Sequence, residues 1–436
     1  MRILIIAYEF PPSPSPGALR WCYLARELAE NGHDIAVLAP RLPLSGSALA
    51  TPENVRVLRT FAGPITGMLE WNARGKSTKP KGSLLDTPTA QTNTDTNWKY
   101  ALVHAVKGLQ GILQFPDARA EWRPWAARAL EAEIAVCRPD LIISAHEPAT
   151  TLQLGFAATR RGIPWVVDLG DPVLAPYTPR RWRSRAARLE RQICKSASHV
   201  VVTTEAARSL LMERHGLDPD SISVLTQGFE DRDGAESGQL DIEFGSASLE
   251  LLYCGRFYPF RKPDQLLAAM DGLDGVRLTI ISPELPAGCT KLAALEGGKV
   301  RYLGHLRHGE ALALQRRADV LVSIGNDGMA AQMPGKLYEY LGAKRPILHL
   351  LGEGGEDPAA ALIDSFGVGW SCVNDAGAVR DRLEKLLAAK HNGALAQARV
   401  GAWAAIEAFG WSRIGRRYSA LVERQAATAQ SQQEAI

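Results

Sequence analysis

Several patterns that would identify a protein class at once are absent from this sequence. It contains no run of about 18 apolar residues, the length that a membrane-spanning helix needs. Its six cysteines form no C-x-x-C pair, so they indicate neither a zinc site nor a disulfide framework. We therefore expect no bound metal and a reducing, cytoplasmic environment. The apolar residues 1–8 are too few for a secretory signal and predict a buried strand.

Two nucleotide-binding motifs are missing as well. The loop after the first predicted strand reads Glu9-Phe-Pro-Pro-Ser-Pro-Ser-Pro-Gly-Ala instead of G-x-G-x-x-G, and Gly17 is the only glycine in it. Because the backbone needs those glycines to approach a dinucleotide closely, an NAD-dependent oxidoreductase is disfavoured. The sequence also has no P-loop.

Length and composition indicate a globular protein of two domains. The 436 residues exceed the roughly 250 to 300 at which a single core stops growing, and 46% of them are hydrophobic and 22% charged. The net charge of +3 is unevenly distributed, because residues 1–228 carry 27 basic and 21 acidic side chains and the rest carry 23 and 26. A basic first half suits an anionic substrate or membrane surface, and a solvated basic face is the alternative.

Strands and helices alternate along the first half of the chain. Residues 2–7 read as a strand, residues 18–31 have the apolar spacing of a helix that Gly32 ends, and residues 34–39 read as a second strand. A strand, a helix and a strand in this order form a parallel sheet. Further strands are predicted at residues 140–144, 165–169, 199–203 and 221–225, and further helices at residues 123–137 and 181–196.

The second half repeats this alternation after the Gly/Asp/Glu-rich stretch 228–245. The sequence therefore predicts an α/β fold with two doubly wound, Rossmann-like domains, at residues 1–228 and 229–410. Since ligands of such sheets bind beyond the carboxyl ends of the strands, we expect the domains to face a central cleft. Residues 62–98 have little to bury and predict a mobile insertion, with substrate contact as the alternative. The strands of the second half are predicted at residues 249–254, 277–281, 300–303, 320–324 and 347–350.

Two basic side chains follow the first strand of the second half. Arg256 comes directly after Tyr253-Cys-Gly, and Lys262 lies six residues further on. Two fixed cations at a strand end are what a departing diphosphate requires, because negative charge grows on it as a bond to it breaks. The alternative is a pair of surface cations.

A second anion-binding pattern begins at Pro334-Gly-Lys-Leu-Tyr-Glu. Pro334 suits the first turn of a helix and Gly335 leaves the backbone accessible. The free amides of Gly335, Lys336 and Leu337 would then form a phosphate site at a helix N-terminus. Glu339, one turn further in, is placed to accept hydrogen bonds from ribose hydroxyls, or else stabilises the helix dipole.

These motifs together resemble the retaining GT-B glycosyltransferases of family four. The resemblance rests on Tyr8-Glu-Phe-Pro-Pro with Gly17, Gly32-His33, Gly255-Arg256 with Lys262, and the run Pro334-Gly-Lys-Leu-Tyr-Glu-Tyr-Leu-Gly-Ala-Lys-Arg-Pro. It extends to Phe409-Gly-Trp-Ser, which is similar to the start of that family's last helix. The resemblance implies a GT-B fold in which a C-terminal helix, residues 411–430, crosses back to complete the N-terminal domain.

The resemblance also implies roles for individual residues. Arg256 and Lys262 would bind the donor diphosphate, and Glu339 the nucleotide ribose. Gly17 would let the first loop pass close to the donor, and His146 would contact the donor sugar, a satisfied loop histidine being the alternative.

Two further positions bear on the site. Asp171 ends another predicted strand, where it would orient the acceptor or cap a helix. The sequence departs from the family's E-x7-E pattern, because Ala331 stands where the first glutamate is expected. Asp327 or Gln332 is the candidate replacement.

The implied activity is metal-independent transfer of a sugar, as by a hexosyltransferase, from a UDP- or GDP-sugar to an acceptor hydroxyl with retention of anomeric configuration. No cofactor is implied, and the acceptor would be a glycan, a lipid-linked or a small molecule of polysaccharide or glycoconjugate biosynthesis, not a nucleic acid. One alternative is a nucleotide-sugar 2-epimerase with Glu147, Asp168 or Asp171 as base; another is a non-catalytic nucleotide-sugar-binding subunit. We expect a cytoplasmic protein, in which the basic run beginning at Arg180 is either a peripheral membrane contact at the inner face or a solvated amphipathic helix.

Overall fold

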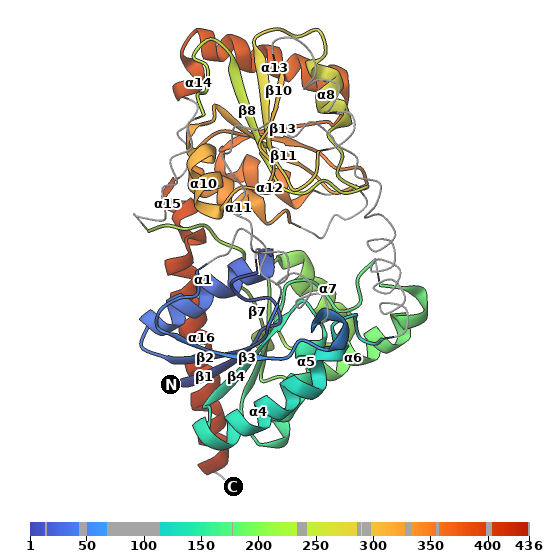
Figure 1. The fold of residues 1–436 in the computed structure, drawn as a ribbon, viewed down its shortest axis with the longest axis vertical. Helices are drawn as coiled ribbons and strands as arrows, with labels where there is room; N and C mark the ends of the chain where they lie inside the picture. Colours follow the sequence, from blue (N-terminus) through green and yellow to red (C-terminus); the bar gives the residue numbers. More distant parts are fainter. Residues whose placement is uncertain are drawn as a thin grey trace. The chain divides into compact units, whose positions relative to one another are not determined.

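The computed structural model divides the chain into two compact units (Figure 1). The first contains Met1–Val202, Arg208–Ser223 and Ser419–Ile436, and the second contains Thr203–Ala207 and Val224–Tyr418. The structure describes residues 1–434 except residues 14, 43–49, 68–113, 177, 233–241, 286–288, 290–297, 328–332, 355–356 and 398–402. Most of the predicted insertion, residues 68–98, therefore lies outside the described residues.

The first unit is built on a seven-stranded sheet with the order β3-β2-β1-β4-β5-β6-β7. The pairs from β3 to β6 are parallel. The first six strands have the Rossmann order, which reverses direction between β1 and β4. The strands are β1 (Arg2–Ile6), β2 (Asp34–Pro40), β3 (Val55–Thr60), β4 (Leu141–His146), β5 (Trp165–Leu169), β6 (His199–Val202) and β7 (Ile222–Val224).

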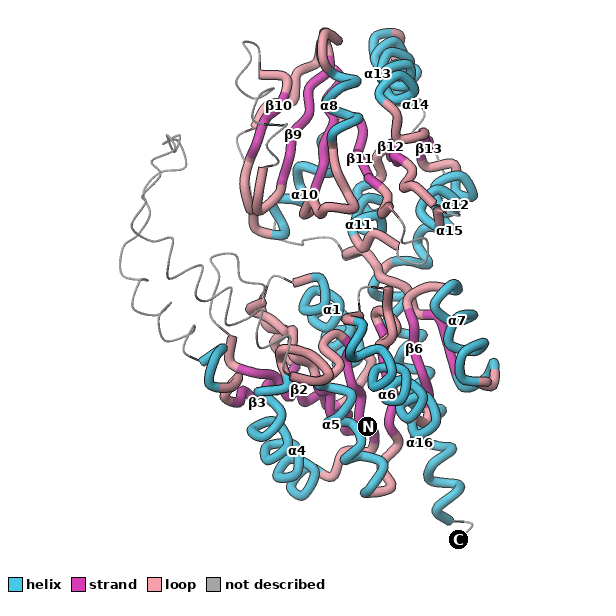
Figure 2. The backbone as a smooth tube through the Cα atoms, turned by 90° about the vertical axis from the view of Figure 1, so that its right-hand side faces the viewer, coloured by secondary structure: helices cyan, strands magenta, loops and turns pink. Residues whose placement is uncertain are grey.

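Helices lie against both faces of this sheet (Figures 1 and 2), so its strands are apolar on both sides. In β1, for example, Ile3, Leu4, Ile5 and Ile6 are all buried. The first helix begins at Pro16 because Ser15 Oγ accepts a hydrogen bond from the amide of Ala18 at 3.0 Å. The helices are α1 (Pro16–Glu30), α4 (Arg123–Cys137), α5 (Thr150–Arg160), α6 (Arg183–Ser196) and α7 (Glu205–His215).

The second unit has a six-stranded sheet with the order β10-β9-β8-β11-β12-β13, and every neighbouring pair is parallel. This is again the Rossmann order, with the reversal between β8 and β11. Its strands are β8 (Leu249–Cys254), β9 (Val276–Ile281), β10 (Val300–Tyr302), β11 (Val320–Ile324), β12 (Ile347–Leu350) and β13 (Gly369–Cys372). Its helices are α8 (Asp264–Met270), α10 (His308–Arg317), α11 (Lys336–Ala343), α12 (Pro358–Phe366), α13 (Ala376–His391), α14 (Ala394–Gln397) and α15 (Trp403–Ile406).

The last helix, α16 (Trp411–Glu434), begins in the second unit and ends in the first. Its start is held by Phe229, whose amide donates to Phe409 and whose carbonyl accepts from Trp411, both at 3.0 Å. From Ser419 onward it is part of the first unit, where the Ser419 hydroxyl lies 2.7 Å from His33 Nε2. No helix in the described part of the chain is long and apolar enough to cross a membrane.

The predicted fold class, two doubly wound parallel sheets, is confirmed. The bounds predicted for β5, β8, β11, β12 and α4 match the structure. Two strands were not predicted. The first, β3, alternates valine with arginine and is only partly buried, and the second, β13, has the mixed sequence Gly-Trp-Ser-Cys. Neither has the continuous apolar run by which the interior strands are found.

Candidate functional site

In the second unit, two loops leave the sheet side by side at its point of reversal. β8 and β11 are paired, and residues 255–262 and 325–327 follow their carboxyl ends. The amide of Asp327 donates to the carbonyl of Phe260 at 3.0 Å. The Arg261 guanidinium donates to Asn326 Oδ1 at 2.9 Å from Nε and 2.6 Å from Nη2. The two loops thus form one connected surface at the edge where such sheets bind ligands.

The loop after β8 is folded into a tight turn. Tyr258 and Arg261 exchange backbone hydrogen bonds of 3.2 and 2.9 Å. The ring of Tyr258 stacks on Phe260 with centroids 5.1 Å apart, and the Arg261 guanidinium lies over Tyr258 at 5.6 Å. Arg261 is therefore held by contacts within the protein. Lys262, which follows the turn, is the next basic residue that could bind a ligand.

Arg256 and Lys262 both lie in this loop with exposed side chains. Gly255, between the strand end and Arg256, has a φ of +153°, which directs the chain out of the sheet. Within the described residues, no ion pair or side-chain hydrogen bond neutralises either cation. The structure thus places both side chains at the carboxyl edge of the sheet with their charge available to a ligand.

The N-terminus of α11 lies on the connection that follows β11. Gly335 is exposed, and a Cβ atom there would meet nothing within 4 Å, so the backbone is open. The amide of Leu337, however, donates to the carbonyl of Pro334 at 2.9 Å. The prediction of three free amides is therefore wrong for Leu337, because the first turn closes on Pro334, which precedes the helix. The amides of Gly335 and Lys336 have no backbone acceptor among the described residues.

Lys336 and Glu339 form an ion pair on the first turn of α11. Lys336 Nζ donates to the two carboxylate oxygens of Glu339 at 2.9 and 2.8 Å, and Gln315 Nε2 lies 3.4 Å from one of them. Burial on its own would raise the pKa of Glu339, but the Lys336 ammonium outweighs it and holds that pKa below its usual value. By the same attraction, the pKa of Lys336 is raised although burial opposes it. Sequence reasoning did not identify this pair, although the i, i+3 spacing signals it.

The strand below is joined to the same helix. The amide of Cys254, the last residue of β8, donates to the hydroxyl of Tyr340 at 2.8 Å. Tyr340 is fully buried, which raises its pKa well above the usual value and keeps the phenol neutral. This bond fixes the end of β8 against α11, so the loop that carries Arg256 and the helix that carries Glu339 start from one rigid base.

A buried Ser–His–Asp chain crosses the neighbouring strands. His349 Nδ1 lies 3.0 Å from Ser323 Oγ, and its Nε2 lies 2.9 Å from Asp357 Oδ2. The other oxygen of Asp357 caps α12 by accepting from the amides of Ala359 and Ala360. Burial would raise the pKa of Asp357, but His349 and the backbone amides of Gly352 and Ala360 lower it to about 2. Ser323 and His349 are themselves buried, so the chain holds loops in place and offers no exposed nucleophile.

The proposed substitutes for the missing first glutamate are only partly described. Asp327 Oδ1 accepts a hydrogen bond from the amide of Glu353 at 3.0 Å, so this carboxylate joins the loop after β11 to the loop after β12. Ala331 and Gln332 lie outside the described residues.

In the first unit, the predicted residues lie on the carboxyl side of the sheet. His146 is the last residue of β4, next to β1 at the point of reversal, and Asp171 follows β5. Gly17 lies in the first turn of α1, not in the preceding loop, because the helix begins one residue before it. A Cβ atom at Gly17 would lie 3.6 Å from Glu9 Cβ, an ordinary contact.

His146 is half-buried, and its Nδ1 has no hydrogen-bond partner among the described residues. The nearby carboxylate of Asp117 accepts from the amide and the hydroxyl of Thr150, both at 2.9 Å. Burial raises the pKa of Asp117, and the electrostatic influence of His146 acts in the opposite direction. Sequence reasoning missed Asp117, because 29 residues separate it from His146 and no motif connects them.

The loop that carries Asp171 is anchored through Glu190 of α6. The fully buried Glu190 accepts from the amide of Leu174 at 2.8 Å and from Arg214 at 2.9 Å. Arg214 in turn donates to the carbonyl of Leu174 at 3.0 Å. The ion pair of Glu190 with the partly exposed Arg214 thus fixes the backbone three residues beyond Asp171.

Asp168, a candidate base in the epimerase alternative, already binds another side chain of the protein. Its two oxygens accept from Nε and Nη2 of Arg20 at 3.2 and 2.8 Å, and both side chains are buried. A carboxylate held on both oxygens by a buried guanidinium is a structural group and is not available to remove a substrate proton. Glu147 is exposed and Asp171 is half-buried.

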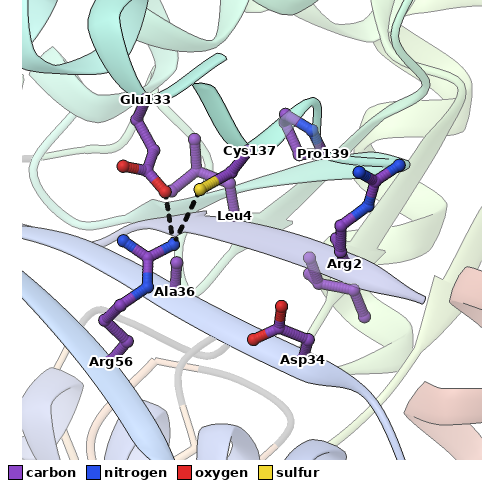
Figure 3. Close-up of a pocket in the computed structure, with 9 residues that line it drawn as sticks. Arg2, Leu4, Asp34, Ala36, Arg56, Glu133, Cys137 and Pro139 are labelled. Carbon is purple, nitrogen blue, oxygen red and sulfur yellow. Dashed lines mark hydrogen bonds and ion pairs between the residues drawn. The ribbon is translucent and has the colours of Figure 1, made fainter. Parts of the chain in front are cut away.

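A small pocket lies elsewhere in the first unit (Figure 3). It is lined by the first residues of the strands, including Arg2, Asp34 and Arg56, and by Glu133 and Cys137 of α4. Arg56 contacts the carboxylate of Glu133, and its Nη2 lies 3.2 Å from Cys137 Sγ. Because ligands of doubly wound sheets bind at the opposite, carboxyl edge, this pocket is not the candidate site.

Comparison with known proteins agrees with this geometry. Residues 17–228 match the family model described as a glycosyl transferase 4-like domain. A curated relative, D-inositol 3-phosphate glycosyltransferase of Corynebacterium glutamicum, is 25% identical over 372 residues, covering 77% of this chain and 79% of the relative.

Solved structures resemble nearly the whole chain. A glycosyltransferase from Rickettsia africae has a TM-score of 0.56 at 14% identity, covering 97% of this chain and 98% of that one. WaaG, a glycosyltransferase involved in lipopolysaccharide biosynthesis, has a TM-score of 0.54 at 14% identity, covering 96% and 95%. The UDP-GlcNAc 2-epimerase of Methanocaldococcus jannaschii has a TM-score of 0.54 at 13% identity, covering 97% and 100%. At such identities the likeness establishes the fold, GT-B, while the matched domain and the curated relative support glycosyl transfer as the activity.

Proposed function

We propose that this protein transfers a sugar from a nucleotide-diphosphate sugar to an acceptor hydroxyl. The observation that carries the proposal is the pair of exposed, unneutralised cations, Arg256 and Lys262, at the carboxyl edge of the second sheet. Charge on the diphosphate increases as the glycosidic bond breaks. Fixed cations therefore stabilise the transition state more than the ground state, which is the condition for catalysis.

The nucleotide is held by α11 and the residues around its start. The amides of Gly335 and Lys336 point from a helix N-terminus and suit a phosphate oxygen. Glu339 keeps lone pairs free after accepting from Lys336, so its carboxylate can also accept from the ribose hydroxyls. UDP- and GDP-sugars both fit these contacts, because none of them touches the base.

The transfer proceeds with retention and without a protein nucleophile. The acceptor oxygen attacks the anomeric carbon on the face from which the diphosphate leaves, and the acceptor proton passes to the leaving phosphate oxygen. The bond between the anomeric carbon and that oxygen breaks as the new glycosidic bond forms. Arg256 and Lys262 supply the positive charge that this step needs, so we infer a metal-independent reaction.

We assign substrate contacts to two residues of the first unit. His146 contacts the donor sugar through its half-buried ring, and Asp171 orients the acceptor hydroxyl from a loop that Glu190 holds in place. The curated relative's name includes a phosphorylated polyol, and the first half of this chain is basic. Both observations support a hydroxyl-bearing, anionic acceptor.

A nucleotide-sugar 2-epimerase is the second candidate, because the fold is equally similar to that of the M. jannaschii epimerase. An epimerase requires a carboxylate base, and the bidentate bond to Arg20 removes Asp168 from the candidates. The matched transferase domain makes transfer the better supported function.

One experiment distinguishes these functions. The purified chain is incubated with UDP-, GDP- and TDP-sugars, and thermal unfolding is followed for each. We expect one nucleotide family to raise the unfolding temperature, and the matching sugar to be consumed only when an acceptor is added. Isomerisation of the sugar without any acceptor would establish the epimerase instead. Protection without turnover in a broad acceptor panel would point to a non-catalytic binding subunit.

A further inference from the structure

A strongly charged surface of the first unit lies on α6, which runs next to α5 (Figure 1). Four of its exposed cations recur three or four positions apart, so they lie on one face of the helix. The opposite face, with Ala186, Leu189 and Ile193, is buried. We call the exposed row the α6 stripe: Arg185, Arg188, Arg191 and Lys195.

No acid offsets this charge along the helix. The only carboxylate within α6 is Glu190, which is buried on the other side and bound to Arg214 and His215. Among the described residues, no carboxylate forms an ion pair with Arg185, Arg188, Arg191 or Lys195. Like charges three and four residues apart on a helix repel one another. The stripe is therefore unfavourable for the isolated chain and favourable only beside an anionic partner.

Aromatic rings lie at the N-terminal end of the stripe. Trp182 is half-buried, and the guanidinium groups of Arg181 and Arg185 lie 5.5 and 5.2 Å from its ring. Phe115 lies 5.5 Å from Trp182 and also contacts Arg185. The indole Nε1 is buried and has no hydrogen-bond partner among the described residues. Cations beside a tryptophan with an unused donor are typical of surfaces that meet lipid headgroups.

We propose that the α6 stripe docks the first unit onto an anionic lipid bilayer. A row of cations on one straight helix matches a flat layer of phosphate headgroups, and the proposal does not depend on the transferase activity. A single-stranded nucleic acid would offer the same phosphates, but it is bound on exposed aromatic rings that stack with bases. Here both rings are half-buried under the arginines, which favours the membrane.

The test uses the full-length chain and vesicles of phosphatidylcholine with or without about 30% phosphatidylglycerol. We expect co-sedimentation with the anionic vesicles only, and its loss at about 1 M salt, where the screening length falls to roughly 3 Å. In the variant R185Q/R188Q/R191Q, partitioning onto anionic vesicles should fall about a hundredfold, since each arginine near such a surface contributes roughly fivefold.

The matched control is R128Q/K385Q/R424Q, which removes the same charge from exposed helical positions outside the stripe. It should partition nearly as the wild type does. Equal losses in the two variants, or equal binding to neutral vesicles, would overturn the proposal. The proposal would also be overturned if the protein bound single-stranded RNA through the stripe but did not bind anionic vesicles. Unfolding temperatures equal to that of the wild type exclude misfolding of either variant.

Discussion

Lys336 donates a hydrogen bond to each oxygen of Glu339, so the carboxylate proposed to bind the ribose is itself held by the first residue of its own helix. The side chain of Glu339 is 7% exposed and that of Lys336 is 38% exposed. The lysine thus shields the carboxylate on the solvent side. It keeps Glu339 ionised and in one position, which a hydrogen-bond acceptor for a ligand requires.

Replacing Lys336 with Met should destabilise the chain by about 1 to 2 kcal/mol at pH 7, because it leaves a buried carboxylate without its cation, a loss reduced by the lysine's partial exposure. The lowered pKa of Glu339 stabilises the fold above its unfolded pKa of roughly 4.3, and this is lost as pH falls through the lower, folded value. In K336M, the lysine no longer opposes the effect of burial, so the pKa of Glu339 should be higher than in the wild type, although His308 and Gln315 still lower it. The difference in unfolding temperature between wild type and K336M should therefore narrow as the pH is lowered from 7 to 4. A constant difference would show that the ion pair does not control the charge of Glu339.

Arg256→Gln and Lys262→Gln should each lower kcat/KM about 10²- to 10³-fold, the usual loss when one stabilising donor to developing charge is removed. Neither side chain has a partner to lose among the described residues, so the unfolding temperature should not change. The matched control is K385Q, an exposed lysine on α13 in the same unit, which should retain full activity. Rates near that of the wild type in both R256Q and K262Q would reject the diphosphate site.

The sequence predicted the elements of the site better than the bonds within it. Apolar runs located β8 and β11, and the position of Arg256 after a strand end followed from them, while Pro334 and Gly335 indicated the start of α11. The bonds that fix these parts join residues far apart in the chain, such as Cys254 with Tyr340. The proximity of such residues can be predicted only when the order of the strands in the sheet is known. The free amide wrongly predicted at Leu337 has a local cause, since a proline one turn earlier supplies an acceptor that spacing rules do not show.

Asp357 should matter more to stability than other capping residues, because it serves both α12 and His349. Asp357→Ala should lower the free energy of unfolding by about 2 to 3 kcal/mol. Roughly 1 kcal/mol of this is the lost helix cap, and the rest arises because the buried Nε2 of His349 loses its partner. The control is Asp375→Ala, since Asp375 caps α13 through Gly377 and Ala378 in the same way but has no histidine partner. With its pKa lowered to about 2, Asp357 stabilises the fold above its unfolded pKa of roughly 3.9, and the contribution is lost between about pH 4 and pH 2. Denaturant titrations of both variants give the two costs, and equal costs would contradict a role for His349.

The buried pair of Arg20 and Asp168 joins α1 to β5 across 148 residues of sequence. Asp168→Asn keeps the shape of the side chain but removes the negative charge that the buried guanidinium of Arg20 contacts through Nε and Nη2, so we expect a loss of about 3 to 5 kcal/mol in denaturant titration. The double variant R20M/D168L removes both charges and should recover most of that loss, because apolar groups of similar size replace a buried ion pair at little cost. R2Q, which breaks the exposed pair between Arg2 and Asp140, should have little effect. If D168N is as stable as the wild type, the ion pair with Arg20 does not contribute to stability. Asp168 would then again be a candidate base for an epimerase.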